Sequence, residues 1–312
     1  MAQDIVGFVG LGTMGRPMVA QLVDGGFTVR VYDIDRDAVT ATQALGNRVS
    51  AAASPAEIGA SCPIVVTMLP SGHEVSDAIA GDEGAASAMG PGGIVLDTSS
   101  SQPWLTQELA RTLEGKGIAL VDAPVSGARE GAETGTLTFM VGGDAESVAR
   151  CRPLLEAMGE RIFHVGAVGA GHVVKSINNL LTATTYLATA EAVTIGAQYG
   201  IDPAMIVDVI NQSTGMNQVT QRQFKRRVLT RRFDSGFSLD LMAKDVGIAL
   251  ELARRMDLPL PVSTLGGTQW RSAQQHLGGG RNIAEIVRWV EHCTGVELAS
   301  DNADDDGKDA TS

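Results

Sequence analysis

The sequence predicts an α/β protein in which a doubly wound sheet is followed by an all-helical C-terminal domain. Short apolar segments alternate with helical segments up to about residue 166, and long helical segments dominate afterwards. A glycine-rich turn joins the first expected strand to the first expected helix. Such alternation is typical of a parallel sheet that carries helices on both faces.

Buried strands are expected where a short apolar run ends at glycine or at small polar residues. The run IVGFVG is the first, and the helix after it has Pro17 in its first turn, where proline is tolerated. Runs of this kind lie at 5–10, 27–33, 63–70, 93–99, 117–127, 137–143 and 161–166. We predict that residues 1–166 form one domain around these strands.

The second half of the chain is expected to be helical. Helical patterns cover 171–199, 203–213, 217–230, 237–256 and 281–293. We predict an all-helical domain for substrate binding and oligomerisation over 167–298, entered by a long interdomain helix. The end of the chain is rich in aspartate and poor in apolar residues, so we expect 299–312 to be a disordered acidic tail.

Composition excludes several classes of function. The 312-residue chain has a net charge of −12 and a pI near 4.8, which argues against nucleic acid or an anionic membrane as a partner. No stretch is apolar enough to be a convincing membrane span. Three scattered cysteines fit a reducing compartment, so we expect a cytoplasmic protein. Neither the cysteines nor the five histidines show metal-ligand spacing, and no metal is expected.

The glycine-rich turn has the spacing of a dinucleotide-binding motif of the Rossmann type. In GxGxxG the first glycine allows the tight turn, the second lets the backbone approach a pyrophosphate, and the third packs helix on sheet. The helix N-terminus offers N–H groups and a positive dipole end to phosphates. The motif comprises Gly10, Leu11, Gly12, Thr13, Met14 and Gly15. Its position between strand and helix favours a cofactor site over a purely structural turn.

An acidic residue follows at the end of the second expected strand. Asp33 comes 18 residues after Gly15, where a carboxylate accepts hydrogen bonds from ribose hydroxyls. A carboxylate there repels a 2′-phosphate, so NAD is favoured over NADP. Arg36 lies close by and weakens that preference, which leaves NADP as an alternative.

Ligands of doubly wound sheets lie beyond the carboxyl ends of the strands. Three further segments are therefore expected to edge the cofactor. They contain Leu69 and Pro70, Thr98, and the pair Ser126 and Gly127. Each segment taken alone is equally compatible with an ordinary loop.

The long helix carries polar residues in an apolar surrounding. In GHVVKSINNLL, Lys175, Asn178 and Asn179 share one helical face. Removal from water lowers the pKa of a lysine and makes its amine a usable proton acceptor. The alternative is a lysine whose ammonium reaches the surface. The dinucleotide motif favours the catalytic interpretation, because a hydride-transfer enzyme that acts on an alcohol needs a proton acceptor.

Four ordered motifs carry a family resemblance. GFVGLGTMGRPM, DAPVSG with GTLTFMVGG, GHVVKSINN and FSLDLMAKD follow one another between residues 7 and 245. The chain resembles the β-hydroxyacid dehydrogenase family, which includes 3-hydroxyisobutyrate dehydrogenase and tartronate semialdehyde reductase. The resemblance implies NAD(P)-dependent interconversion of a 3-hydroxy acid, at its terminal hydroxymethyl group, with the semialdehyde.

The resemblance also implies roles for individual residues. Lys175 would be the catalytic acid and base, and Asn179 would hold the substrate near it. Ser126 and Gly127 would bind the substrate carboxylate. Lys244 would come from the helical domain to the nicotinamide end of the site. A homodimer or homotetramer is expected, because the long apolar helix has faces left to cover.

The sequence departs from the family pattern at two places. Ala128 replaces a glycine that often follows the serine–glycine pair, and Asn217 and Gln218 suggest a more polar substrate pocket. A related small aldehyde acid, such as tartronate semialdehyde, succinic semialdehyde or glyoxylate, is therefore an alternative substrate. A non-catalytic nicotinamide sensor is an alternative of another class. A sensor has no need of Lys175.

Overall fold

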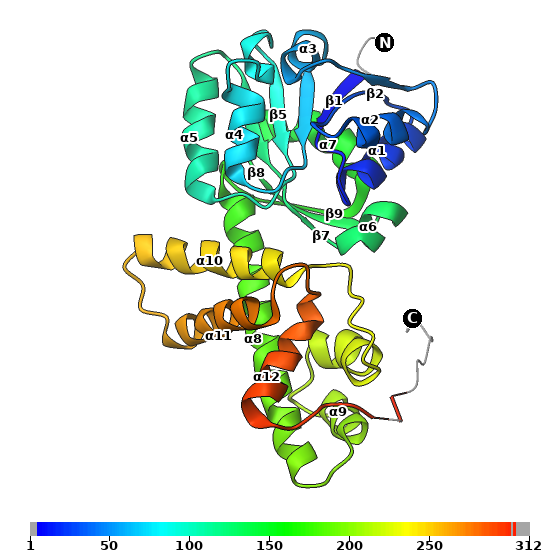
Figure 1. Ribbon diagram of the computed structural model, residues 1–312. Coiled ribbons are helices and arrows are strands. Elements are labelled where there is room, and N and C mark those ends of the chain that lie inside the picture. The colour runs from blue at the N-terminus through cyan, green and yellow to red at the C-terminus, as the bar shows by residue number, and fades with distance from the viewer. Residues whose placement is uncertain (1–4, 301, 304–312) are drawn as a thin grey trace. The chain divides into compact units, whose positions relative to one another are not determined.

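The computed structural model describes residues 5–300, 302 and 303 (Figure 1). These residues divide into two compact units, one ending at Lys175 and one beginning at Ser176. The division falls inside a continuous helix, α8 (Ala170–Gln198). Each unit has its own hydrophobic core.

The described part of the first unit contains a nine-stranded sheet. Its strands are β1 (Ile5–Val9), β2 (Thr28–Tyr32), β3 (Val49–Ala51), β4 (Ile64–Thr67), β5 (Ile94–Asp97), β6 (Ala119–Asp122), β7 (Val125–Ser126), β8 (Leu137–Gly142) and β9 (Gly159–Gly166). The order is β3-β2-β1-β4-β5-β6-β8-β7, with β9 beside β8. The direction of winding reverses between β1 and β4, which is where a doubly wound sheet binds its ligand.

The sheet is parallel from β3 to β6 and becomes mixed afterwards. Strand β8 pairs antiparallel with β6 and β7 and parallel with β9. The expected doubly wound sheet is confirmed, and the antiparallel turn at β7 and β8 is an addition that apolar patterning alone does not reveal. Strand β7 continues the line of β6 along β8, so Ser126 lies beyond the carboxyl end of β6.

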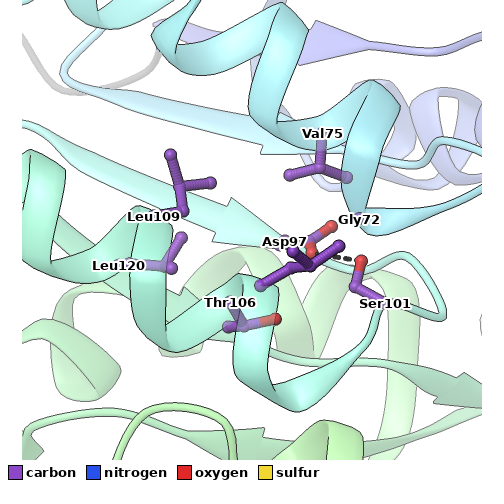
Figure 2. Close-up of a pocket in the computed structure, with 8 residues that line it drawn as sticks. Gly72, Val75, Asp97, Ser101, Thr106, Leu109 and Leu120 are labelled. Carbon is purple, nitrogen blue, oxygen red and sulfur yellow. Dashed lines mark hydrogen bonds between the residues drawn. The ribbon is translucent and has the colours of Figure 1, made fainter. Parts of the chain in front are cut away.

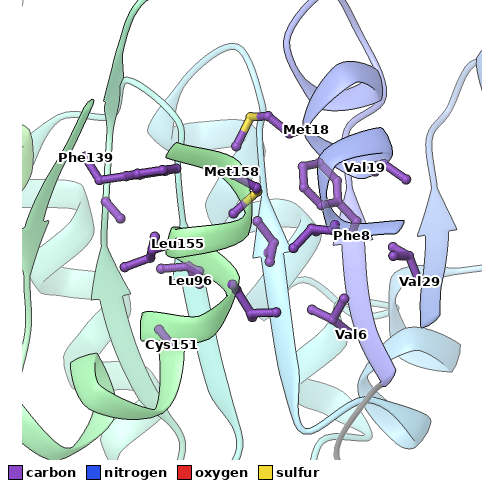
Figure 3. Packing of buried hydrophobic residues seen from close by; sticks show 14 of the residues in the cluster. Val6, Phe8, Met18, Val19, Val29, Leu96, Phe139, Cys151, Leu155 and Met158 are labelled. Carbon is purple, nitrogen blue, oxygen red and sulfur yellow. The ribbon is translucent and has the colours of Figure 1, made fainter. Parts of the chain in front are cut away.

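Helices cover both faces of the sheet (Figure 1). They are α1 (Gly15–Asp24), α2 (Arg36–Gln43), α3 (Pro55–Ser61), α4 (Gly72–Ala80), α5 (Pro103–Glu114), α6 (Ala128–Thr134) and α7 (Ala145–Met158), with a 3₁₀ turn η1 (Ala85–Ser87). Consecutive strand residues alternate between two cores: Val66 and Leu96 face one, and Val65 and Val95 face the other. Figure 3 shows the first core, where α1 and α7 pack on the strands. Burial on both faces explains why these strands are continuously apolar.

The described part of the second unit is helical. Besides most of α8 it contains α9 (Pro203–Asn211), the π-helix η2 (Thr220–Leu229), α10 (Leu239–Arg255), α11 (Pro261–Leu277), the 3₁₀ turn η3 (Ile283–Glu285) and α12 (Ile286–Thr294). Trp270, Tyr186 and Phe224 are among its largest fully buried side chains. None of the helices in the described ranges is long and apolar enough to cross a membrane.

Two elements of the described residues were not expected from the sequence, and two residues of the expected tail make hydrogen bonds to Asp202. Strand β3 has only three residues, and α11 contains a glycine pair that obscures its helical pattern. Ser300 and Asn302, which belong to the segment expected to be a disordered tail, donate hydrogen bonds to Asp202 at 2.7 and 2.8 Å. The remainder of that expected tail, 301 and 304–312, lies outside the described residues.

Candidate active site

The glycine-rich turn follows β1 and opens α1, as its spacing predicted. Gly10 has a φ of +99°, in the region that favours glycine, and its N–H donates to the Tyr32 carbonyl at 3.0 Å. A Cβ on Gly15 would lie 1.9 Å from the Gly10 carbonyl oxygen, so the helix packs directly on the turn. A Cβ on Gly12 would have nothing within 4 Å. The turn is therefore closed on its inner side and open at Gly12, where a pyrophosphate has to approach.

Asp33 stands directly after β2 and is fixed by two backbone groups. Its carboxylate accepts the Leu11 N–H at 2.6 Å and the Asp35 N–H at 2.8 Å. The first bond ties the glycine-rich turn to the end of β2. Arg36 lies over the Tyr32 ring, 5.6 Å from its centroid. The turn, the open Gly12 position and this anchored carboxylate fit a dinucleotide with its ribose at β2.

The expected segments after β4 and β5 lie at the same edge of the sheet but differ in what they offer. A Cβ on Gly10 would lie 2.9 Å from Leu69 Cδ2, so Leu69 borders the turn, and Pro70 beside it is exposed. Leu69 N–H donates to the Ser99 hydroxyl at 2.9 Å. Thr98 is buried, and its hydroxyl donates to the Thr67 carbonyl at 2.6 Å. The Thr98 hydroxyl proton is thus already used within the protein.

Ser126 and Gly127 form the corner between β7 and α6. Ser126 pairs with Thr138 of β8, and Gly127 has a φ of +133°. The next residue, Ala128, has a φ of +52° although it is not a glycine. A glycine suits this position because the backbone is left-handed. Ala128, which departs from the family pattern, adopts this backbone at a conformational cost.

Lys175 lies in the second turn of α8 and is 9% exposed. The start of this helix is held by Asp122, the last residue of β6. The two carboxylate oxygens accept the Gly169 N–H at 2.6 Å and the His172 N–H at 2.9 Å. A carboxylate at a helix N-terminus satisfies N–H groups that lack partners and complements the helix dipole. The long helix therefore begins at the carboxyl edge of the sheet, in the same unit as the glycine-rich turn.

In the second unit, the structure brings Asn179 and Lys244 together through one buried carboxylate. Asn179 Nδ2 donates to Asp245 Oδ2 at 2.6 Å, and the Asn178 side chain donates to Asn179 Oδ1 at 3.1 Å. Lys244 Nζ lies 3.5 Å from Asp245 Oδ1. The amide of Asn179 is thus held in one orientation, and its Nδ2 carries a second N–H besides the one that bonds Asp245.

Sequence reasoning did not single out three buried residues that hold groups of the candidate site: Asp122, His172 and Asp245. Two of them stand inside motifs that were noted, DAPVSG and FSLDLMAKD, and His172 stands in GHVVKSINN. Their partners are far away in sequence, so only the fold reveals their roles. Asn217, expected to make the pocket polar, stands just before η2, where its Oδ1 accepts the N–H groups of Val219 and Thr220 at 3.0 and 3.1 Å.

The space behind Asp97 is packing and holds no ligand. Figure 2 shows its lining, which includes Gly72, Thr106 and Leu120, and the bond of 2.9 Å from the Ser101 hydroxyl to Asp97. The gap is too small to admit a water-sized molecule. Within the described residues, no group of three or more histidine, cysteine or acidic side chains is placed to hold a metal ion.

Both halves of the chain match known families. Residues 5–166 match the family model for the NAD binding domain of 6-phosphogluconate dehydrogenase. Residues 169–290 match the model described as NAD-binding of NADP-dependent 3-hydroxyisobutyrate dehydrogenase. Together these matches agree with the cofactor geometry, and the first unit binds NAD, with NADP as the alternative.

Individual relatives cover nearly the whole chain. The 2-(hydroxymethyl)glutarate dehydrogenase of Eubacterium barkeri is 35% identical over 94% of this chain and 97% of its own. The NAD-dependent L-serine dehydrogenase of Pseudomonas aeruginosa is 36% identical over 85% and 91%. A solved structure of Mycobacterium tuberculosis 3-hydroxyisobutyrate dehydrogenase with L-serine superimposes with a TM-score of 0.84 and 31% identity, over 92% and 99% of the chains. The resemblance seen in the motifs is thereby confirmed, and the chain belongs to the β-hydroxyacid dehydrogenase family of NAD(P)-dependent oxidoreductases.

Proposed function

We propose that this protein oxidises the terminal hydroxymethyl group of a 3-hydroxy acid to an aldehyde, or reduces the semialdehyde in the reverse direction. The observation that carries the proposal is a buried lysine near the start of α8, in the same unit as the dinucleotide turn. Burying a lysine amine costs free energy, so its place near the carboxyl edge of the sheet makes it a candidate for the chemistry. Hydride transfer from an alcohol requires a group that takes the hydroxyl proton.

The substrate class follows from what the relatives' substrates share. The names of these relatives specify 2-(hydroxymethyl)glutarate, L-serine and 3-hydroxyisobutyrate. Each of these molecules has a hydroxymethyl group on the carbon that carries a carboxylate. The remaining substituent differs, from a second carboxylate to an amine or a methyl group. The proposed substrate is therefore a small anion with this common unit.

The proposed mechanism assigns a role to each residue. Ser126 and Gly127 bind the substrate carboxylate, and Asn179 donates to the reacting oxygen. Lys175 accepts the hydroxyl proton in oxidation and returns it in reduction. The nicotinamide, when bound, accepts or supplies the hydride. Lys244 is proposed to contact the nicotinamide end of the cofactor. With the cofactor bound, holding the hydroxymethyl carbon against the nicotinamide and its hydroxyl against the Lys175 amine would contribute much of the rate.

The test is turnover with matched lysine variants. The purified protein is incubated with NAD or NADP and with 3-hydroxyisobutyrate, 2-(hydroxymethyl)glutarate, L-serine or glycerate, and reduced-nicotinamide absorbance is followed. Lys175→Met is expected to lose turnover while it still binds cofactor. Lys116→Met is the control, because this lysine only donates to the Ala86 carbonyl, at 3.2 Å. Near-normal turnover of Lys175→Met would contradict the mechanism, and cofactor binding without turnover on any hydroxy acid or semialdehyde would favour the sensor.

We also propose a homodimer or homotetramer that works in the cytoplasm. An apolar stripe of exposed residues, Ile177, Leu181, Ala188, Ala192, Ile195 and Tyr199, runs along and just past α8. Apolar stripes of this length are covered by a partner more often than left in water. Free cysteines, two of them buried, fit a reducing compartment.

A further inference from the structure

A fully buried histidine stands one turn before Lys175 on α8. The His172 ring has both nitrogens in contact with the protein: Nε2 lies 3.0 Å from the Ser99 carbonyl oxygen, and Nδ1 lies 2.9 Å from the Thr106 hydroxyl. Two buried carboxylates flank the ring, Asp97 at 3.6 Å from Nε2 and Asp122 at 3.7 Å from Nδ1. All of these residues belong to the first unit.

These contacts fix the orientation of the ring. A carbonyl oxygen only accepts, so Nε2 carries a proton and donates to the Ser99 carbonyl. Nδ1 forms its hydrogen bond with the Thr106 hydroxyl, which also lies 3.2 Å from the Gln102 carbonyl oxygen. Both ring nitrogens are therefore held by the protein.

The ring joins four elements at one point. Ser99 and Asp97 stand at the end of β5, Asp122 at the end of β6, Thr106 in α5, and His172 itself in α8. The backbone next to the histidine is closely packed on the sheet, because a Cβ on Gly171 would lie 2.1 Å from the Met140 carbonyl oxygen. The first turn of α8 thus has one position relative to the carboxyl edge of the sheet.

We propose that His172 is the positioning residue that sets the place of the Lys175 amine in the reaction. This inference rests on the proposed function of Lys175. Residues three apart lie on neighbouring positions of one helical face, so a rotation or shift of the first turn displaces both side chains. A displacement of about 1 Å at a reacting group costs on the order of 100-fold in rate. His172 does not touch the substrate in this proposal.

The test compares two substitutions of different chemistry. His172→Leu fills the site without hydrogen bonds, whereas His172→Gln retains an amide that can donate to the Ser99 carbonyl. We expect His172→Leu to lower kcat by about 30-fold or more, with the KM values and the Kd for NAD changed by no more than about threefold. His172→Gln is expected to recover most of the loss. Thr106→Val, which removes only the Nδ1 partner, should give an intermediate kcat.

A stability control separates positioning from folding. Val148→Ala removes buried apolar volume from the core of the same unit and lowers Tm without touching α8. The kcat of each variant is calculated from the concentration of NAD-binding sites, so that unfolded protein does not lower the value. A kcat for His172→Leu within threefold of the native value, or a loss in Val148→Ala that matches it, would overturn the proposal. If Lys175→Met retained turnover, the proposed function would fail first; if only His172→Leu were normal, the positioning role alone would fail.

Discussion

Three aspartates use their carboxylates to hold backbone and side-chain groups of the candidate site. Asp33 accepts N–H groups from the glycine-rich turn and the loop after β2, Asp122 accepts them from the start of α8, and Asp245 accepts the amide of Asn179. Charge-assisted hydrogen bonds of this kind are shorter and stronger than neutral ones. Each carboxylate therefore holds a backbone segment or an amide of the candidate site in one position.

The open position at Gly12 leads to the first residue-scale prediction. Gly12→Ala adds a Cβ that meets nothing in the protein and needs no left-handed backbone. We expect Tm to change by less than a degree or two while the affinity for NAD falls at least tenfold, an estimate of about 1.4 kcal/mol. Thermal unfolding and a fluorescence titration with NAD measure the two effects.

Gly15→Ala is the matched control for that prediction. Its Cβ would lie 1.9 Å from the Gly10 carbonyl oxygen, so the helix has to move. We expect a clear loss in Tm together with weaker NAD binding. If Gly12→Ala bound NAD as the native protein does, the pyrophosphate would have to lie elsewhere.

The second residue-scale prediction concerns the orientation of Asn179. Asp245→Ala removes the acceptor for Asn179 Nδ2 and the carboxylate near Lys244. We expect KM for the hydroxy acid to rise about tenfold, because one hydrogen bond that is no longer aimed at the substrate is worth about 1 kcal/mol or more. Asp240→Ala, on the same helix, loses two hydrogen bonds and should leave KM unchanged. Equal KM effects in the two variants would count against an orienting role for Asp245.

How much of the site is visible in the sequence depends on the sequence separation of the interacting residues. The glycine spacing and the position of Lys175 on a helix are local patterns, and the structure places both as expected. His172, by contrast, bonds Ser99 and Thr106, 73 and 66 positions away. Asn217 shows a local contact that the sequence analysis did not consider, since its Oδ1 accepts two backbone N–H groups just after it in the chain.

Among the elements, those with strong periodicity were predicted and those held by tertiary contacts were not. Helix α11 contains Gly266 and Gly267, which weaken a helix on their own. In the structure a Cβ on Gly267 would lie 2.4 Å from Leu250 Cδ1, so the glycine allows α11 to pack closely on α10. Trp270 donates to the Ala183 carbonyl at 3.2 Å and anchors the same helix. These tertiary contacts stabilise α11, and they leave no periodic pattern of apolar residues in the sequence.

The element-scale prediction concerns the N-cap of α7. Asp144 accepts the Ser147 N–H at 2.9 Å, and the hydrogen bonds from the side chain and backbone of Ser147 lower the pKa of the Asp144 carboxyl. The charged carboxylate therefore stabilises the folded state fully at pH values above the ordinary pKa of aspartate. This contribution is lost as the pH falls through the lowered pKa. Asp144→Ala should cost about 1 kcal/mol at neutral pH.

Asp144→Asn isolates the part that depends on pH. An asparagine caps a helix without ionising, so the difference in urea midpoint between native protein and Asp144→Asn should shrink as the pH is lowered from 7 to 3. Circular dichroism at a series of pH values measures the midpoints. A difference that stayed constant over this range would mean that the charge of Asp144 contributes nothing.

At the scale of the whole molecule, the sequence motifs of this family span both units. The dinucleotide turn, Asp33 and Lys175 belong to the first unit, whereas Asn179 and Lys244 belong to the second. Helix α8 is the element they share, and it carries Lys175 and Asn179 one turn apart. In the proposed mechanism these two side chains are the proton acceptor and the substrate amide, and their spacing is set within α8.

The exposed face of α8 leads to the last prediction. Leu181 and Ile195 are 67% and 74% exposed within the chain, two members of the apolar stripe along α8. If a second copy covers the stripe, the native protein elutes at twice 32.5 kDa or more in light scattering. A double variant, Leu181→Glu with Ile195→Glu, should dissociate, because two buried carboxylates without partners cost more than the apolar contact gains. Met256→Glu, at an exposed apolar residue outside the stripe, should keep the native mass. A native protein that elutes as a monomer at micromolar concentration would leave the stripe uncovered, and a double variant that kept the native mass would place the subunit interface on another face.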